Sequence, residues 1–145
     1  MSAKKFFTTE QQKSIQQAIA NAELNTSGEI RVHIDDTCKG EVLDCAANMF
    51  HQMKMNKTDL RNGVLFYLAV SDKKFAILGD KGINEKVPTD FWDTIKETVL
   101  TYFKQQQFTE GLCKGIEMAG EKLKTNFPLQ SNDTNELTND VSFGK

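Results

Sequence analysis

The chain has 145 residues, of which 39% are hydrophobic, and this size provides one substantial core but is short for two domains. Its 18 basic and 20 acidic residues are scattered and give a formal net charge of -2, which argues against a nucleic-acid-binding face. The longest apolar run, residues 64–70, is far shorter than a membrane span, and the first residues lack the apolar region of a secretion signal, so we expect a cytoplasmic location.

The first part of the chain has a helical pattern, then a strand pattern, then a second helical pattern. Thr8 or Thr9 can cap a helix that ends near Asn25, because glutamines follow at the capping-box spacing. Apolar and polar residues alternate from Glu29 to Asp35, which predicts a half-covered strand. A second helix over about 41–55 then makes a crossover connection to the next strand.

A predicted hairpin follows. Residues 63–70 form a nearly unbroken apolar run, which is typical of a strand buried on both faces, and the polar turn 71–74 leads into a third strand over 75–79. The crossover makes the first two strands parallel, whereas the short turn makes the third strand antiparallel to the second.

Two further helices and a polar tail complete the predicted chain. The third helix begins at Pro88 or Thr89, and Thr109 can cap a fourth helix that closes before Pro128. We therefore expect an α/β fold, a three-layer α/β/α sandwich with a small mixed β-sheet flanked by helices, as one domain over residues 1–128. Residues 129–145 are polar and are predicted to form a disordered tail that does not dock.

The three cysteines do not suggest a disulfide framework or a zinc site. Cys38, Cys45 and Cys113 are odd in number and include no pair at the spacing of a metal-binding knuckle. We expect them to be reduced thiols.

Strand direction divides the acidic residues between two ends of the sheet. With two parallel strands and an antiparallel third, one end carries Glu29, Asp59, Asn62 and Asp80, and the other carries the acids near residues 35 and 72. Oxygen ligands from separate segments suit a hard cation such as calcium or magnesium.

Two more residues, Asn84 and Asp90, complete the candidate ligand set, because they lie on the glycine-rich loop and at the helix start that follow the third strand. The alternative is purely structural: Asp80 and Asp90 stabilise a turn and cap a helix, and Glu29 is solvated. His33 and His51 lack a partner at metal-binding spacing, and no nucleophile motif is present, so nucleophilic catalysis has no support.

Residues 8–127 resemble the TPM domain family of thylakoid lumen, photosystem II repair and receptor-modulator proteins. The resemblance implies an α/β/α sandwich with a shallow acidic site, divalent-cation binding in some members, and acid-phosphatase activity in the thylakoid branch. Many members also carry a secretion signal and a membrane anchor. We expect neither in this chain, which therefore resembles a soluble cytoplasmic branch. The motifs that carry the resemblance are Thr26-Ser27-Gly28-Glu29-Ile30, Arg61-Asn62-Gly63-Val64-Leu65, Asp72-Lys73-Lys74 and Gly79-Asp80-Lys81-Gly82-Ile83.

Within these motifs, Glu29 matches the acidic position of the family's TGxEI, Asn62 matches its NGVL, and residues 82–83 match the start of its GLE. Asn84 stands where many relatives have the glutamate of that last motif. The resemblance therefore implies a cation site here, but with weakened phosphatase activity.

Two hypotheses from different classes follow. In the first, the chain is a TPM-like domain that binds calcium or magnesium and acts weakly on a phosphate ester, without a covalent phospho-enzyme. In the second, it is a non-catalytic interaction module that binds a protein partner. Neither hypothesis involves nucleic acid or a membrane span.

Overall fold

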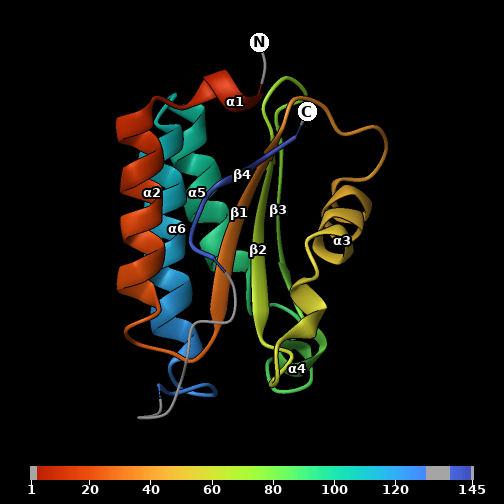
Figure 1. Ribbon diagram of the computed structural model, residues 1–145, viewed down its shortest axis with the longest axis vertical. Helices are drawn as coiled ribbons and strands as arrows, with labels where there is room; N and C mark the ends of the chain where they lie inside the picture. The colour runs from red at the N-terminus through yellow and green to blue at the C-terminus, as the bar shows by residue number, and fades with distance from the viewer. Residues whose placement is uncertain (1–2, 130–137, 145) are drawn as a thin grey trace.

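The computed structural model describes residues 3–129 and 138–144, and Figure 1 shows their arrangement. In chain order the elements are α1 (Ala3–Phe6), α2 (Thr9–Ala22), β1 (Glu29–Asp35), α3 (Val42–Gln52), the 3-10 helix η1 (Met55–Lys57), β2 (Gly63–Ala69), β3 (Lys74–Gly79), α4 (Lys81–Asn84), α5 (Asp93–Lys104), α6 (Phe108–Leu123) and β4 (Ser142–Phe143).

The strands form one mixed sheet in the order β3-β2-β1-β4. β1 runs parallel to β2, with Glu29 opposite Gly63, and β3 runs antiparallel to β2, with Gly79 opposite Val64. Both directions confirm the predicted crossover and hairpin.

Helices cover both faces of this sheet, which confirms the three-layer fold (Figure 1). α2, α5 and α6 lie on one face, where the larger apolar cluster includes Ile15 and Ile19 of α2 at helical spacing. α3 lies on the other face, where a smaller cluster includes Phe50, Leu65 and Tyr67. Alternate residues of β2 thus reach two separate cores, as its continuous apolar run indicates.

Local sequence explains where the helices begin. Thr8 and Gln11 form the predicted capping box, in which the Gln11 backbone N–H donates to Thr8 Oγ1 at 3.1 Å and the Thr8 N–H donates to Gln11 Oε1 at 2.9 Å. α5 begins at Asp93, later than the predicted Pro88 or Thr89, because residues 89–92 form turns. α6 begins at Phe108 without a side-chain cap, so Thr109 is not its cap.

The prediction that residues 129–145 do not dock is wrong for residues 138–144. Ser142 pairs with His33 and Phe143 with Ile34, so β4 joins the sheet beside β1, and Val141 is buried in the larger core. The reason is a short apolar alternation that the polar composition of the tail conceals. The predicted disorder of residues 130–137 lies outside the described residues, and the domain boundary at 128 stays a prediction.

The prediction of three reduced thiols is also wrong. Cys38 and Cys45 form a disulfide, with Cα atoms 6.1 Å apart, whereas Cys113 is free. The Lys74 ammonium, at the start of β3, donates to the carbonyl oxygens of Cys38 and Gly40 at 2.9 and 2.8 Å and so ties the loop before α3 to the sheet. The Cys38–Cys45 disulfide weighs against the predicted cytoplasmic location, because disulfides persist mainly in oxidising compartments. The location itself stays a prediction. None of the helices in the described ranges could cross a membrane.

Candidate functional site

Strand pairing brings three of the predicted residues to one end of the sheet. The Glu29 N–H donates to the Asn62 carbonyl oxygen at 3.2 Å, and the Asp80 N–H donates to the Gly63 carbonyl oxygen at 2.9 Å. This confirms the order that strand direction predicts. It does not make the three side chains converge, because each has its own partners.

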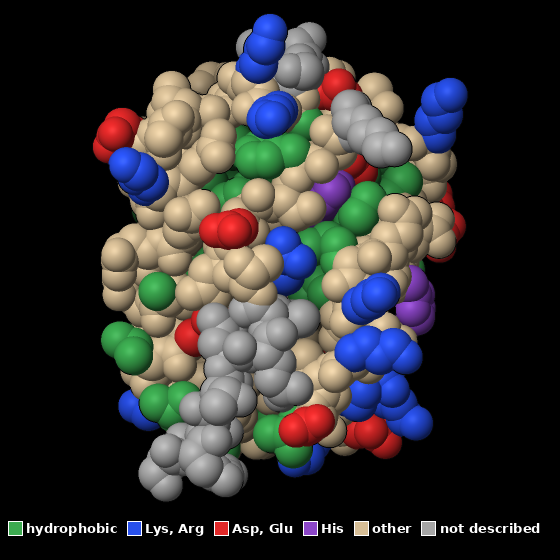
Figure 2. Space-filling view, in the orientation of Figure 1, with side chains coloured by type: hydrophobic (Ala, Val, Ile, Leu, Met, Phe, Trp, Pro, Cys, Tyr) green, Lys and Arg blue, Asp and Glu red, His purple; other side chains and the backbone are tan. Residues whose placement is uncertain are grey.

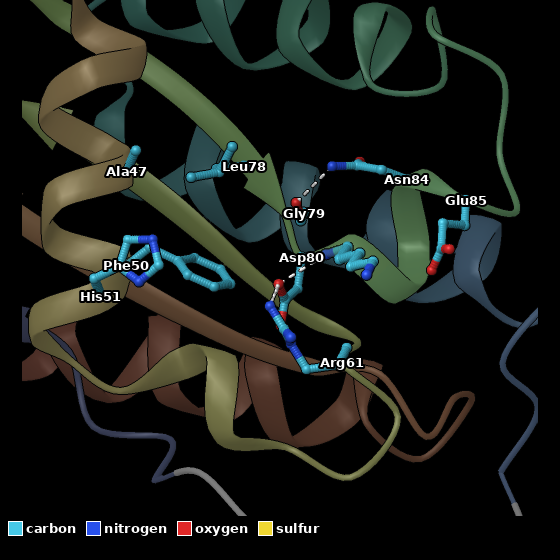
Figure 3. Close-up of a pocket in the computed structure, with 10 residues that line it drawn as sticks. Ala47, Phe50, His51, Arg61, Leu78, Gly79, Asp80, Asn84 and Glu85 are labelled. Atoms are coloured by element: carbon cyan, nitrogen blue, oxygen red, sulfur yellow. Dashed lines mark hydrogen bonds and ion pairs between the residues drawn. The ribbon is translucent and has the colours of Figure 1, made fainter.

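A cavity of about 390 Å³ opens at this end of the sheet, between α3, the end of β3 and α4 (Figure 3). Asp80 and Asn84 are the two predicted ligands that line it. The full lining comprises Ala47, Phe50, His51, Arg61, Leu78, Gly79, Asp80, Lys81, Asn84 and Glu85.

The dominant interaction in this cavity is an ion pair between Arg61 and Asp80 (Figure 3). Arg61 Nε donates to Asp80 Oδ2 at 2.8 Å and Nη2 donates to Oδ1 at 2.9 Å, which is the two-pronged geometry that an arginine offers a carboxylate. The Lys81 backbone N–H also donates to Oδ1, at 2.7 Å. The Asp80 side chain is 6% exposed and the Arg61 side chain 42%, so Asp80 is fixed while the guanidinium still reaches solvent.

Close backbone contact holds this pair in place. The Gly82 N–H donates to the Arg61 carbonyl oxygen at 2.8 Å, and a Cβ on Gly82 would lie only 2.1 Å from the Leu60 carbonyl oxygen. Arg61 itself has a positive φ of 50°. The segment before β2 and the start of α4 are therefore in contact only because residue 82 has no side chain.

Asn84 and Glu85 form the outer wall of the cavity. Asn84 Nδ2 donates to the Gly79 carbonyl oxygen at 3.0 Å, and both side chains are otherwise exposed. The pKa of Arg61 is raised, first by its hydrogen bonds to Asp80, then by the charges of Asp80 and Glu85. Two carboxylates thus act on one guanidinium.

The remaining predicted ligands lie away from the cavity lining. Asn62 is buried and its Nδ2 donates to the Ser27 carbonyl oxygen at 3.2 Å, so its amide holds the turn before β1. Asp59 and Asp90 are exposed. Within residues 3–129 and 138–144, no group of three or more His, Cys, Asp or Glu side chains is arranged to hold a metal ion.

Glu29 is buried beside a second carboxylate that the sequence analysis did not identify. Glu23 Oε2 accepts a hydrogen bond from the Ile30 N–H at 3.0 Å. Burial, and secondarily the charge of Glu29, raise the pKa of Glu23 to about 7. The one sequence feature that could have predicted this pair of carboxylates is the position of Glu23 at the end of α2, six residues before Glu29.

Arg61 and Glu85 were also missed as site residues. Arg61 entered the sequence analysis only as part of a family motif, and Glu85 was not singled out as a ligand. An arginine in a loop next to a strand-end aspartate is the signal that could have identified the pair.

The chain was compared with protein families and solved structures. Residues 2–122 match the family model of the TPM domain. An NMR structure of the BA42 protein from the psychrophilic bacterium Bizionia argentinensis is 51% identical, covers 97% of each chain and superimposes with a TM-score of 0.91. No match was found among curated proteins.

Two more distant structures show the fold alone. The N-terminal domain of a protein from P. gingivalis is 15% identical, with a TM-score of 0.67 over 85% of this chain and 80% of that one. The N-terminal domain of the cg2496 protein from Corynebacterium glutamicum is 11% identical, with a TM-score of 0.63 over 97% and 81%. Because the family model matches residues 2–122 of the 145, this chain belongs to the TPM domain family.

Proposed function

We propose that the cavity beside Arg61 and Asp80 binds a phosphate ester together with a divalent cation. The supporting observation is the Arg61 guanidinium, which is fixed by a buried carboxylate on one side and open to the cavity on the other. An arginine held in this way offers its remaining donors to phosphate oxygens.

Basic side chains are exposed near the cavity, whose own lining balances Arg61 and Lys81 against Asp80 and Glu85. Figure 2 shows Lys and Arg side chains gathered at the lower right, over the region where Figure 1 places the end of α3 and α4. Lys54, Lys57 and Lys81 are exposed in this part of the chain. Exposed lysines in this region would draw anionic ligands toward the cavity.

The cation in this proposal is magnesium, or calcium in the same place, held jointly by protein and phosphate. Magnesium keeps several waters and usually takes only one or two carboxylates, with substrate phosphate completing its shell. Asp80, Glu85 and the amide oxygen of Asn84 fit this limited donor set, whereas a protein-only cage would need more carboxylates than the cavity has. When bound, the cation would polarise a phosphoryl oxygen and orient a water.

Any hydrolysis would be slow and without a covalent intermediate. Arg61 and Lys81 would orient the phosphate, and Asn84 in place of the family's glutamate removes one carboxylate from the cavity wall. We assign no catalytic residue.

Titration of calcium or magnesium, phenyl phosphate, and both together into labelled protein tests this proposal. We expect each ligand to raise the affinity of the other, because coupling between two sites is reciprocal, and the backbone signals of residues 61 and 78–85 to move. Asp80→Asn should weaken cation binding at least tenfold, whereas the matched change Asp59→Asn, on an exposed aspartate outside the cavity lining, should not. Shifts confined to other residues, or no coupling, would refute the proposal.

An aryl phosphate assay with and without chelator addresses turnover separately. Weak activity that disappears with chelator and rises in Asn84→Glu supports the enzyme form of the proposal. Robust activity that survives chelation contradicts it.

The second candidate function is a non-catalytic interaction module. The observation that favours it is the saturation of Asp80, both of whose oxygens already accept hydrogen bonds from Arg61 and the Lys81 N–H. Ligand binding with no turnover, even in Asn84→Glu, would favour this candidate.

A further inference from the structure

The outer edge of β1 is covered by a short strand from a distant part of the sequence. Figure 1 shows β4 lying alongside β1, on the side away from β2. Ser142 lies opposite His33, Phe143 lies opposite Ile34, and the Gly144 N–H donates to the Ile34 carbonyl oxygen at 2.8 Å. Two paired residues thus cover a strand that is seven residues long.

Side chains on both faces of the sheet recognise this segment. Val141 and Phe143 pack into the larger apolar cluster on the helical face. On the opposite face, Ser142 Oγ lies 2.9 Å from His33 Nδ1. Successive residues point to opposite faces in a strand, so the edge selects an aliphatic residue, a hydroxyl and an aromatic ring in that order.

The residue after the aromatic position must be glycine. A Cβ on Gly144 would lie 2.0 Å from Asp35 Oδ1. That oxygen cannot easily move, because His33 Nε2 holds it at 2.8 Å and the Tyr67 hydroxyl donates to the other oxygen of Asp35 at 2.6 Å. Asp35 thus leaves no room for a side chain at position 144.

The β4 segment leaves one donor at this edge unmatched. Arg31 Nη2 donates to the Asp140 carbonyl oxygen at 3.3 Å, but the buried Arg31 Nε has no hydrogen-bond partner among the described residues. A buried donor without an acceptor costs stability. The Asp140 carboxylate acts on this guanidinium by its charge but makes no hydrogen bond to Nε, so a strand that placed an acceptor within reach of Nε would satisfy a donor that the present segment does not.

We propose that the outer edge of β1 is a strand-accepting site for a partner protein, and that residues 140–144 occupy it when the partner is absent. The partner presents an extended segment with an aliphatic residue, Ser or Thr, an aromatic residue and Gly in consecutive positions, preceded by an acceptor for Arg31. It adds a parallel strand to β1, and main-chain hydrogen bonds along the edge provide affinity. The site is separate from the cavity at Asp80, so either proposal can fail without the other.

A labelled peptide of residues 138–145 serves as the probe, and the acceptor is the full chain carrying Gly144→Val. The new side chain meets Asp35, so the chain's own segment should leave the edge and the backbone signals of residues 31–35 should shift. The tethered segment competes in the wild-type chain at high effective concentration, so we expect the peptide to bind the variant at least tenfold more tightly. The control peptide carries valine at the glycine position and should not bind.

Four results would overturn the proposal. These are no binding of the peptide to the variant, equal affinity for variant and wild type, a variant whose own segment stays in place, and a concentration-dependent dimer of the wild type that disappears with Gly144→Val. The last result would identify a second copy of the chain as the occupant. If the variant does not fold, excess unlabelled peptide is added to labelled wild type, where unchanged signals of residues 141–144 refute exchange and their displacement supports it.

Discussion

Replacement of Gly82 by alanine tests whether close backbone contact builds the cavity. In an unobstructed helix this change would stabilise the protein by up to about 1 kcal/mol, because glycine is a poor helix former. Here the added Cβ would lie 2.1 Å from the Leu60 carbonyl oxygen and 2.6 Å from that of Arg61, and both are backbone atoms. Overpacking of this kind costs about 1 to 3 kcal/mol, and loss of the Gly82 hydrogen bond to Arg61 costs about 0.5 to 1.5 kcal/mol.

The two costs exceed the helical gain, so we expect Gly82→Ala to lower the free energy of unfolding by roughly 1 to 3 kcal/mol. Urea denaturation measures this, and the side-chain N–H signal of Arg61 reports whether its pair with Asp80 moves. Lys81→Ala is the control, because it lies in the same short helix on an exposed side chain and should change stability by less than about 0.5 kcal/mol. A neutral or stabilising Gly82→Ala with an unmoved Arg61 signal would refute the reasoning.

Three further changes have expected outcomes. The folded-state pKa of Glu23, about 7, lies above its ordinary 4.5, so the stability from its protonated form is present below about pH 4.5 and lost as pH rises through 7. Glu23→Gln keeps an acceptor for the Ile30 N–H and should remove this loss. Urea denaturation at pH 5 and pH 8 measures it, and the same pH dependence in both proteins would contradict the prediction. Reduction of the Cys38–Cys45 bond, which closes a short loop, should cost about 2 to 3 kcal/mol in thermal denaturation, and an unchanged melting temperature would show that the loop is held without it. Val141→Asp should cost about 2 kcal/mol or more, because it places a charge in the larger core, and a loss below about 0.5 kcal/mol would mean that β4 contributes little.

The sheet could be predicted from the sequence because its signals are long. Seven alternating residues in β1 and an unbroken apolar run in β2 fix strand type, and the helix between them fixes their parallel direction. β4 has only two paired residues, and its signal is the alternation of Val141, Ser142 and Phe143 within a polar stretch. A pattern of that length is too short to distinguish a docked strand from a disordered tail.

The candidate site was predicted in position but not in composition. Strand direction places Glu29, Asn62 and Asp80 at one end of the sheet, yet it does not say where each side chain points. The buried amide of Asn62 binds the turn at Ser27, and Asp80 binds Arg61. Those choices depend on loop geometry, on the positive φ of Arg61 and on the close approach at Gly82, none of which has a periodic signal in the sequence.

The polar face of β1 bears on the proposed strand-accepting edge. Its alternation with apolar residues was interpreted as a half-covered strand, but His33 on that face is only 2% exposed. Burial lowers the pKa of His33 more than its hydrogen bond to Asp35 raises it, so the neutral ring is favoured in the fold. A neutral imidazole with Nε2–H donating to Asp35 leaves Nδ1 as the acceptor for the Ser142 hydroxyl.

This arrangement explains why a polar strand edge needs a strand beside it. Loss of the β4 segment would expose the His33 acceptor and the Ile34 carbonyl oxygen together, and water or another strand would have to replace both contacts. Because the folded-state pKa of His33 is lowered, acid begins to oppose the fold once the pH falls below the ordinary value of about 6.5, and protonation of the folded ring, at lower pH still, turns that acceptor into a donor. Acidification should therefore weaken the hold on β4, and the backbone signals of residues 141–144 should change as the pH falls below that range; signals that stay unchanged would contradict this role of His33.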